Sequence, residues 1–291
     1  MLRGLYTAAA GMVTQQRRHD TVTNNIANLN TPGFKQVNAV SKSFPDMLVS
    51  LTGVENQPAK RIGVINTGVF AEESLSIHLQ GDLFQTNGTL DFALSSNLGV
   101  EGAAFDGSGK YVDPESGEVT FQPQAFFTVQ DRNGETRYTR DGKFSLNSEG
   151  YLVTGDNSLV LGTNNAPIRF AGDIALDNLA LGENQRFVDR VTGADTGMQL
   201  LISRVENPNL LVRDGNSKLR NEGGEENVRA ANAGELATIE VRQGFIERSN
   251  VDSAQSAVDL MAAFRAYEAN QKIVQYYDRS LEKAVNEIGR V

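Results

Sequence analysis

Apolar side chains recur at every seventh position near both ends of the chain, and this spacing predicts a long helix at each end. The C-terminal stretch 253–288 contains neither Pro nor Gly, and its first row consists of Leu260, Tyr267, Val274, Leu281 and Ile288. A second row follows three residues behind the first, at Ala263, Asn270, Tyr277 and Ala284. Together the rows form a narrow apolar stripe along one face of a helix that Ser249 or Asp252 is suited to cap.

The N-terminal stretch, from Leu2 to Leu29, carries a weaker version of the same pattern. It has no Pro, and its rows are Leu5, Met12, His19 and Ile26, and beside them Ala8, Gln15, Val22 and Leu29. Helices with such narrow stripes bury too little apolar surface to offset the entropy of ordering their backbones. We therefore expect these helices to pack against neighbouring molecules. The alternative is that both lie across a β core of the same chain.

The segment from Asn24 to Lys35, NNIANLNTPGFK, ends the N-terminal helix. Its Asn residues disfavour a helix interior because their side chains compete for backbone hydrogen bonds. Pro32 pushes Thr31 out of the α region, and Gly33 tolerates a positive φ. Taken alone, the segment is a helix stop followed by a loop.

Between the helices, short apolar runs separated by turn sequences predict an antiparallel β domain. Turns rich in Gly, Asn and Asp follow one another about every 8–10 residues between Ala125 and Gly162, as in a β-meander. We expect strands at 126–129, 137–140, 143–146, 151–154, 159–162, 199–205 and 237–243. The stretch from Leu51 to Thr67 lacks a clear period and is expected to be an extended connector.

Composition changes this picture mainly by exclusion. The formal charge of −9 leaves no basic stripe for phosphates, so we expect no nucleic-acid partner. The absence of Cys excludes disulfides and Cys-based metal sites. No apolar run is long enough to span a membrane, and no signal peptide is visible. Composition alone therefore predicts a soluble, cytoplasmic, β-rich protein.

The residue pattern is not typical of an enzyme. The two His residues, His19 and His78, fall on the helical stripe and in an expected strand, away from any evident base or nucleophile. P-loop, HExxH and GxSxG motifs are absent, and the turn at 106–109 does not have the spacing of an EF-hand loop. We expect no catalytic residue, no metal site and no cofactor.

Several ordered motifs resemble those of the flagellar axial proteins, the rod and hook proteins of the bacterial flagellum. At the N-terminal end, ANLNTPGFK at 27–35 is similar to the family's ANxxTxGFK. At the C-terminal end, QGFIERSNVD at 243–252 and RAYEANQ at 265–271 resemble two further family elements. YTRDGKF at 138–144 is similar to an element of the rod proteins, and with the length it favours the distal-rod group. The chain departs from the family pattern at 37–57 and at the Gly-rich stretch 95–125.

The resemblance implies an α+β fold, in which long N- and C-terminal helices pair as a coiled-coil-like stalk with a central antiparallel β domain. It implies a terminal helical core domain at 1–35 and 250–291, and an extended connector and β segment at 36–80 and 225–249. The remaining stretch, 81–224, would be the central β-rich domain, with an insertion at 95–125.

The resemblance also implies a structural role, as a subunit of the flagellar basal-body rod that self-assembles helically and transmits torque from motor to hook. The implied partners are other copies of the chain, neighbouring rod or hook proteins and the flagellar type III export apparatus, with no nucleic acid and no direct membrane insertion. The implied location is the basal body outside the cytoplasmic membrane, after export without a cleaved signal peptide. The alternatives are a hook or hook-junction protein and, from another class, a soluble coiled-coil adhesin that forms a discrete trimer.

On this interpretation, Asn24–Lys35 is a joint between the helical core and the β domain. Its Asn amides would bond backbone groups of a neighbouring subunit, and Phe34 would anchor the bend. Substitution of Asn28 or Gly33 is therefore expected to impair assembly rather than folding of the β domain. The residues expected to make assembly contacts are Asn24, Asn25, Asn28, Thr31, Gly33, Phe34, Leu260, Tyr267, Asn270, Val274 and Leu281.

Overall fold

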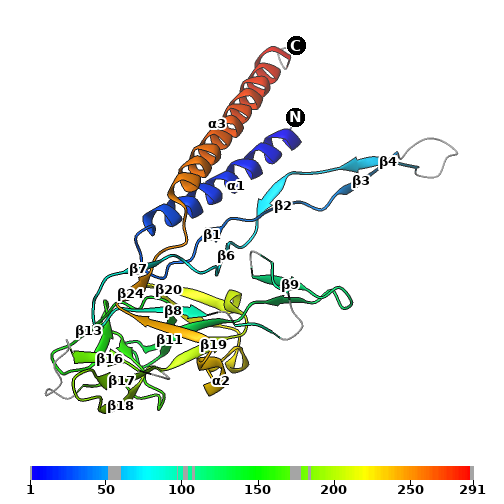
Figure 1. Ribbon diagram of the computed structural model, residues 1–291. Helices are drawn as coiled ribbons and strands as arrows, with labels where there is room; N and C mark the ends of the chain where they lie inside the picture. The colour runs from blue at the N-terminus through cyan, green and yellow to red at the C-terminus, as the bar shows by residue number, and fades with distance from the viewer. Residues whose placement is uncertain are drawn as a thin grey trace. The chain divides into compact units, whose positions relative to one another are not determined.

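The computed structural model describes residues 2–51, 60–96, 98–100, 104–106, 109–170, 178–182 and 185–288 (Figure 1). The chain divides into two compact units. The first, which we call the helical unit, comprises Met1–Ala27, Val37–Leu75 and Asp252–Val291. The second, the β unit, comprises Asn28–Gln36 and Ser76–Val251. The α+β class predicted from the sequence is confirmed, and the three-part division of the chain stays a prediction.

Two long helices run side by side in the helical unit, α1 (Leu2–Ala27) and α3 (Ser253–Lys283), with the π-helical turn η5 (Ala284–Ile288) after α3 (Figure 1). The Asp252 carboxylate caps α3 by accepting the backbone N–H groups of Ala254 and Gln255 at 2.8 and 2.9 Å. Helix α1 ends at Ala27, two residues before the expected Leu29, since the chain turns at Asn28. None of the helices in the described part of the chain has the length and apolar character that a membrane span requires.

The two helices pack antiparallel, and glycines on α1 set how closely they approach. A Cβ at Gly4 would lie 2.1 Å from the Tyr277 hydroxyl, and one at Gly11 would lie 3.0 Å from the Asn270 amide nitrogen. On α3 and the start of η5, the rows predicted from the heptad spacing are buried or half-buried from Leu260 to Ala284. On α1 the predicted rows are likewise buried or half-buried, and Gly4 and Gly11 beside them leave room for side chains of the partner helix. Supercoiling of the pair as a coiled coil stays a prediction.

A β-hairpin in the helical unit replaces part of the expected connector. Strand β3 (Met47–Leu51) pairs antiparallel with β4 (Lys60–Ile65), which lies inside the stretch that we expected to be an extended connector. The strand pairing was not predicted because Ile62 and Val64 are both exposed, so no alternation of buried and exposed positions marks the strand. The same unit contains β1 (Val37–Asn38) and the pair β2 (Ser41–Ser43) and β5 (Val69–Ala71). Strand β6 (Leu75–Ser76) crosses into the β unit.

The β unit is built on an antiparallel sheet of nine strands within the described residues. The order is β13-β14-β15-β11-β12-β21-β20, and β19 joins the other part of β11 and carries β22. The bounds are β11 (Gln124–Gln130), β12 (Thr136–Thr139), β13 (Phe144–Leu146), β14 (Leu152–Thr154), β15 (Leu159–Val160), β19 (Ile202–Val205), β20 (Leu211–Gly215), β21 (Lys218–Asn221) and β22 (Val228–Ala230).

The β unit also contains smaller strand pairs, a three-stranded sheet and short helices. The remaining elements are β7 (Leu83–Gln85) with β24 (Phe245–Glu247), β8 (Phe92–Ser96) with β23 (Ile239–Gln243), β9 (Lys110–Val112) with β10 (Val119–Phe121), the sheet β16 (Leu179–Leu181), β17 (Arg186–Asp189) and β18 (Asp195–Gln199), and the short helices η3 (Pro208–Leu210), η4 (Glu225–Asn227) and α2 (Ala233–Leu236). Each strand range expected from the sequence overlaps an observed strand, but the strand expected at His78 is not observed. Within the expected insertion at 95–125, residues 110–121 form the β9–β10 hairpin.

Phenylalanines form the centre of the β unit. The rings of Phe127 and Phe144 meet edge to face at 5.3 Å, and those of Phe170 and Phe187 at 5.1 Å. Strand β11 is buried along almost its whole length because other elements cover both of its faces. Its buried run Ala125–Val129, which is apolar except for Thr128, reflects this position.

Candidate functional site

Three of the sequence motifs meet in a buried ion cluster inside the β unit. The Lys35 ammonium lies 2.6 Å from one carboxylate oxygen of Glu247, and the Arg140 guanidinium lies 2.8 Å from the other. The exposed fraction of the side chain is 6% for Lys35, 2% for Arg140 and 0% for Glu247. Lys35 lies in the segment after α1, Arg140 follows β12, and Glu247 ends β24, so this triad joins three segments of the β unit that are far apart in the chain.

The charges in the triad are surrounded by further hydrogen bonds. Arg140 donates to the backbone oxygens of Ala125 at 2.8 Å and Leu94 at 3.1 Å, and to the Gln80 side chain at 2.8 Å. Lys35 also donates to the Leu79 oxygen at 2.7 Å, and Glu247 accepts the Gly81 N–H at 2.9 Å. Buried ions are tolerated when their remaining donors and acceptors are satisfied in this way.

The electrostatics of the triad favour its ionised form. Burial would raise the pKa of the Glu247 carboxyl, but Arg140 and Lys35 outweigh burial and hold that pKa below its usual range. Burial and the neighbouring Arg140 lower the pKa of Lys35 to about 8, against the opposing effect of Glu247. Lys35 is therefore still mostly charged at neutral pH.

His78 lies beside this cluster, in an irregular segment and not in the strand that we expected. Its ring meets the Phe126 ring edge-on at 6.5 Å, and neither ring nitrogen has a hydrogen-bond partner within the described residues. Burial, reinforced by Lys35 and Arg140, lowers the pKa of His78 to about 3, so the ring is neutral at physiological pH. A neutral, enclosed imidazole of this kind adds packing rather than acid–base chemistry.

The backbone of the helix-stop segment is anchored at the same place. Gly33 has a φ of 67° and donates its N–H to the Glu247 backbone oxygen at 2.8 Å. A Cβ on Gly33 would lie 2.5 Å from the Arg140 carbonyl carbon, which is closer than any side chain can come. We had expected substitution of Gly33 to impair assembly and to leave folding of the β domain intact. This geometry indicates that a larger residue at position 33 also disturbs the packing of the β unit.

Phe34 and Thr31 complete the anchored turn. The Arg213 guanidinium lies over the Phe34 ring at 4.3 Å and donates to the Lys35 backbone oxygen. The Thr31 hydroxyl donates to the Asn28 side-chain oxygen at 3.1 Å. Phe34 is thus held within its own β unit, consistent with an anchor for the bend.

The two Asn residues predicted at the end of α1 lie in the helical unit. Asn25 is buried, donates to the Val37 backbone oxygen at 2.7 Å and accepts the Val37 N–H at 3.0 Å. It therefore joins α1 to β1 of its own chain, whereas we expected a bond to a neighbouring subunit. Asn24 is exposed on the last turns of α1.

The predicted residues on α3 share one face of that helix. All are half-buried and follow the seam that meets α1, namely Leu260, Tyr267, Asn270, Val274 and Leu281. Their part in contacts between subunits stays a prediction. A second set of large apolar residues is exposed and was not singled out as a separate surface. It comprises Val258, Met261, Phe264, Ile273 and Tyr276 on α3 and Val285 on η5.

Sequence reasoning missed the triad as a site, although its three residues stand inside the motifs. Charged residues in a motif do not reveal that they are buried. Lys35 and Glu247 are 212 residues apart in the chain, and Arg140 and Glu247 are 107 apart. In the motif at 27–35 Lys35 is the only charged residue, but the motifs at 138–144 and 243–252 carry three each, so the sequence did not indicate which of these charges are buried together.

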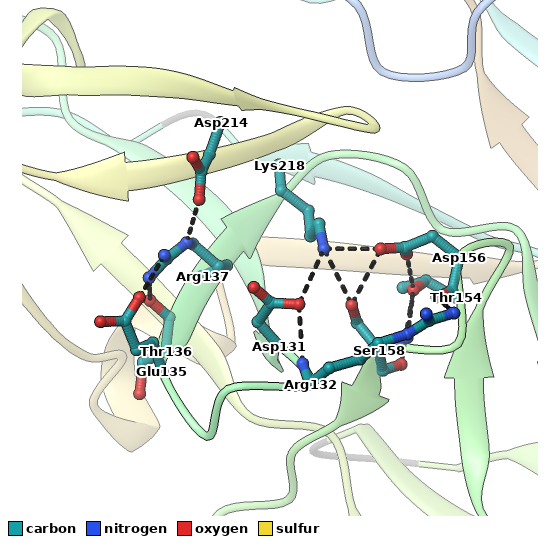
Figure 2. A network of polar contacts seen from close by, with 10 residues as sticks. All are labelled: Asp131, Arg132, Glu135, Thr136, Arg137, Thr154, Asp156, Ser158, Asp214 and Lys218. Atoms are coloured by element: carbon teal, nitrogen blue, oxygen red, sulfur yellow. Dashed lines mark hydrogen bonds and ion pairs between the residues drawn. The ribbon is translucent and has the colours of Figure 1, made fainter.

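A second polar network lies where β21 meets the turns that follow β11 and β14 (Figure 2). Lys218 reaches Asp156 at 2.5 Å, the Ser158 hydroxyl at 2.9 Å and Asp131 at 3.5 Å. A Ser beside a Lys can act as a nucleophile and base in some hydrolases. Here Ser158 is fully buried and donates its hydroxyl to Asp156 at 3.0 Å, so the pair is held as a structural contact. Among the described residues, no group of acidic or His side chains is placed to hold a metal ion.

The Asp156 carboxylate makes the free energy of unfolding depend on pH in the acid range. Burial would raise the pKa of Asp156, but hydrogen bonds from Lys218, Thr154 and Ser158 outweigh it and lower the pKa to about 2. In the unfolded chain the pKa of Asp156 is about 3.9, so at pH values between about 2 and 3.9 the unfolded chain binds more protons than the folded one. The free energy of unfolding therefore falls as the pH drops from about 5 to 2. We expect Asp156→Asn to lower the unfolding free energy at neutral pH and to flatten this acid dependence. Urea unfolding at several pH values measures both, and an unchanged acid slope would contradict the assignment.

Comparison with known proteins places these motifs in context. Family models match at residues 5–35 (Flagella basal body rod protein), 121–185 (Flagellar hook protein FlgE/F/G D1 domain) and 242–287 (Flagellar basal body rod FlgEFG protein C-terminal). The chain is 34% identical to the flagellar hook-basal body complex protein FlhO of Bacillus subtilis, over 100% of both chains. It is 29% identical to the flagellar basal-body rod protein FlgG of the same species, over 98% of this chain and 99% of that one. FlgG of Borreliella burgdorferi is also 29% identical, over 98% of both chains.

Proposed function

This chain belongs to the family of flagellar basal-body rod and hook proteins, and from that membership we propose that it is a rod subunit that assembles helically with its own copies. Neighbouring rod or hook proteins are its other partners. The assembled subunits transmit torque from the motor to the hook. The named relatives are structural proteins, and we propose no catalytic activity.

The exposed apolar side chains of the helical unit are the observation that carries this proposal. Phe264 and Tyr276 on α3 are 52% and 66% exposed, and Tyr6 on α1 is 70% exposed. Large apolar residues on the outer side of an already paired helix mark a surface for further partners. A contact of two unlike surfaces that does not close on itself builds a filament. The paired α1 and α3 then form the coiled-coil-like stalk of the assembly.

Export through the flagellar type III apparatus, without a cleaved signal peptide, fits the physical properties of this chain. The chain has no Cys, so no disulfide has to be reduced before it passes unfolded through a channel. Terminal helices that gain stability from neighbours are protected from assembling too early. The proposed location is the basal body outside the cytoplasmic membrane.

Charge placed on the outer face of α3 tests the proposal. We expect Phe264→Glu with Tyr276→Glu to abolish polymerisation at concentrations where the unchanged chain sediments as filaments, because a buried unpaired carboxylate is costly. The matched control is Val191→Glu, on a residue of the β unit that is 72% exposed. Circular dichroism should show both variants folded. If the α3 variant polymerises as well as the control, α3 is not the assembly surface.

A hook or hook-junction protein is the second candidate, favoured by the match of residues 121–185 to a hook-protein domain model. The two candidates differ in where the subunit lies along the axis. Locating the chain in a density map of purified basal bodies would decide between them: density below the hook supports the rod, and density within the hook overturns it.

A further inference from the structure

The hairpin of β9 and β10 projects from the rest of the β unit as a separate two-stranded sheet (Figure 1). Val112 and Val119 stand directly opposite each other across the two strands, and they are 49% and 43% exposed. Opposed residues of an antiparallel pair share one face. A two-stranded hairpin is only marginally stable unless another surface covers its apolar face.

The turn of this hairpin is acidic. The Asp113 carboxylate is used inside the turn, where it accepts the backbone N–H groups of Glu115 at 2.7 Å and Ser116 at 3.2 Å. The carboxylates of Glu115 and Glu118 are exposed and form no hydrogen bond or ion pair with the described residues. The hairpin thus presents a small apolar face beside two carboxylates that can bind a cation.

A groove elsewhere in the β unit has the complementary character. It encloses about 250 Å³. Its apolar side is lined by Leu29, Pro32, Phe84 and Ile246, and its polar side by Asn30, Glu247, Arg248 and Ser249. Phe84 is 53% exposed. The exposed Arg248 guanidinium makes no hydrogen bond or ion pair within the described part of the chain. An uncovered aromatic ring beside a free guanidinium fits an apolar segment that carries a carboxylate.

We propose that the β9–β10 hairpin of one copy docks into this groove of a second copy. Val112 and Val119 cover Phe84 and its apolar neighbours, while Glu115 or Glu118 pairs with Arg248. The two surfaces differ, so each copy has a free hairpin and a free groove after docking, and the contact propagates. The inference rests on the proposed self-assembly and names one surface that carries it.

Cross-linking of mixed copies tests this contact directly. The chain has no Cys, so an introduced Cys is unique. One copy carries Val119→Cys and a tag, and the other carries Ser249→Cys. When they polymerise together, we expect a short bis-maleimide to give a tagged–untagged dimer. The control partner carries Thr192→Cys, an exposed position on another turn of the β unit, and should give none.

Charge reversal tests the proposed ion pair. We expect Arg248→Glu alone, and Glu115→Arg with Glu118→Arg alone, each to raise the critical concentration for polymerisation roughly three- to tenfold. Combining both sets of changes should bring the critical concentration back close to that of the unchanged chain, because the ion pair is then reversed in sign and not lost. Arg190→Glu, a change at another exposed Arg of the β unit, is the matched control and should leave it unaltered.

The outcomes separate this inference from the proposed function. Filaments that form normally without the 119–249 cross-link, or without the effect of charge reversal, overturn the docking while self-assembly stands. A hairpin that cross-links only to another rod or hook protein added to the mixture also overturns it. Failure of the unchanged chain to polymerise at any concentration overturns both.

Discussion

Glu247→Gln is expected to lower the free energy of unfolding of the β unit by about 3–5 kcal/mol. The change keeps the shape of the side chain but leaves the Lys35 and Arg140 cations buried without their shared anion. Lys35 already has a pKa of about 8 through burial and the adjacent Arg140, so in the variant it can shed its proton more easily. The loss should therefore be smaller at about pH 9 than at neutral pH, because the unfolded chain then holds the additional proton. Urea unfolding of the variant and the unchanged chain at neutral pH and at about pH 9 measures this difference in the free energy of unfolding.

Glu240→Gln is the matched control for this prediction. Glu240 also pairs with an Arg, at 2.7 Å from Arg242, but the two side chains are 58% and 45% exposed. An exposed pair contributes less than about 1 kcal/mol, so the control should be nearly neutral. Equal losses in the two variants would mean that the triad does not stabilise the β unit more than an exposed ion pair does.

Gly33→Ala is expected to lower the unfolding free energy by about 2–4 kcal/mol, from two causes. The backbone φ of 67° is unfavourable for a residue with a Cβ, and that Cβ would lie 2.7 Å from the Asp141 nitrogen. The segment and the turn after β12 must separate to admit the methyl group. This separation would also strain the adjacent contacts of Lys35 and Arg140 with Glu247.

Gly193→Ala separates these two causes. Gly193 has nearly the same φ, 65°, but a Cβ there would meet no atom within 4 Å. Only the conformational cost of about 1 kcal/mol should appear. The same unfolding assay compares the two variants, and a Gly33→Ala loss no larger than that of Gly193→Ala would show that the segment is not packed as the structure has it.

The helical end of the chain was largely predictable because its signal is local. On α3, a spacing of seven residues places Leu260, Tyr267 and their successors on one face, and that face is the one that is buried. On α1 the same reasoning chose Leu5 and Met12, which are half-buried, but it did not show that Gly4 and Gly11 leave room for side chains of the partner helix. Small residues carry no hydrophobic signal, and their value lies in the space that they leave for the partner helix.

The strands between the helices were recognisable where one face is buried and turns follow regularly. The β3–β4 hairpin was missed because Ile62 and Val64 are both exposed, so nothing marks a buried face. The Asn25 contact was assigned to a neighbouring molecule, and it is made to Val37 of the same chain. An amide in a motif indicates a hydrogen bond without indicating its partner.

The sequence by itself determined the helical ends, the β-rich middle, the motifs of the family and the absence of Cys, because these depend on composition and on short spacings. Only the tertiary structure decided that Lys35, Arg140 and Glu247 share one buried site. It also decided that position 33 has no space for a Cβ, so that only Gly fits there. The physical reason is that ion pairing and close backbone packing depend on distance in space. Folding brings Glu247 to within 2.6 Å of a residue that lies 212 positions away in the chain.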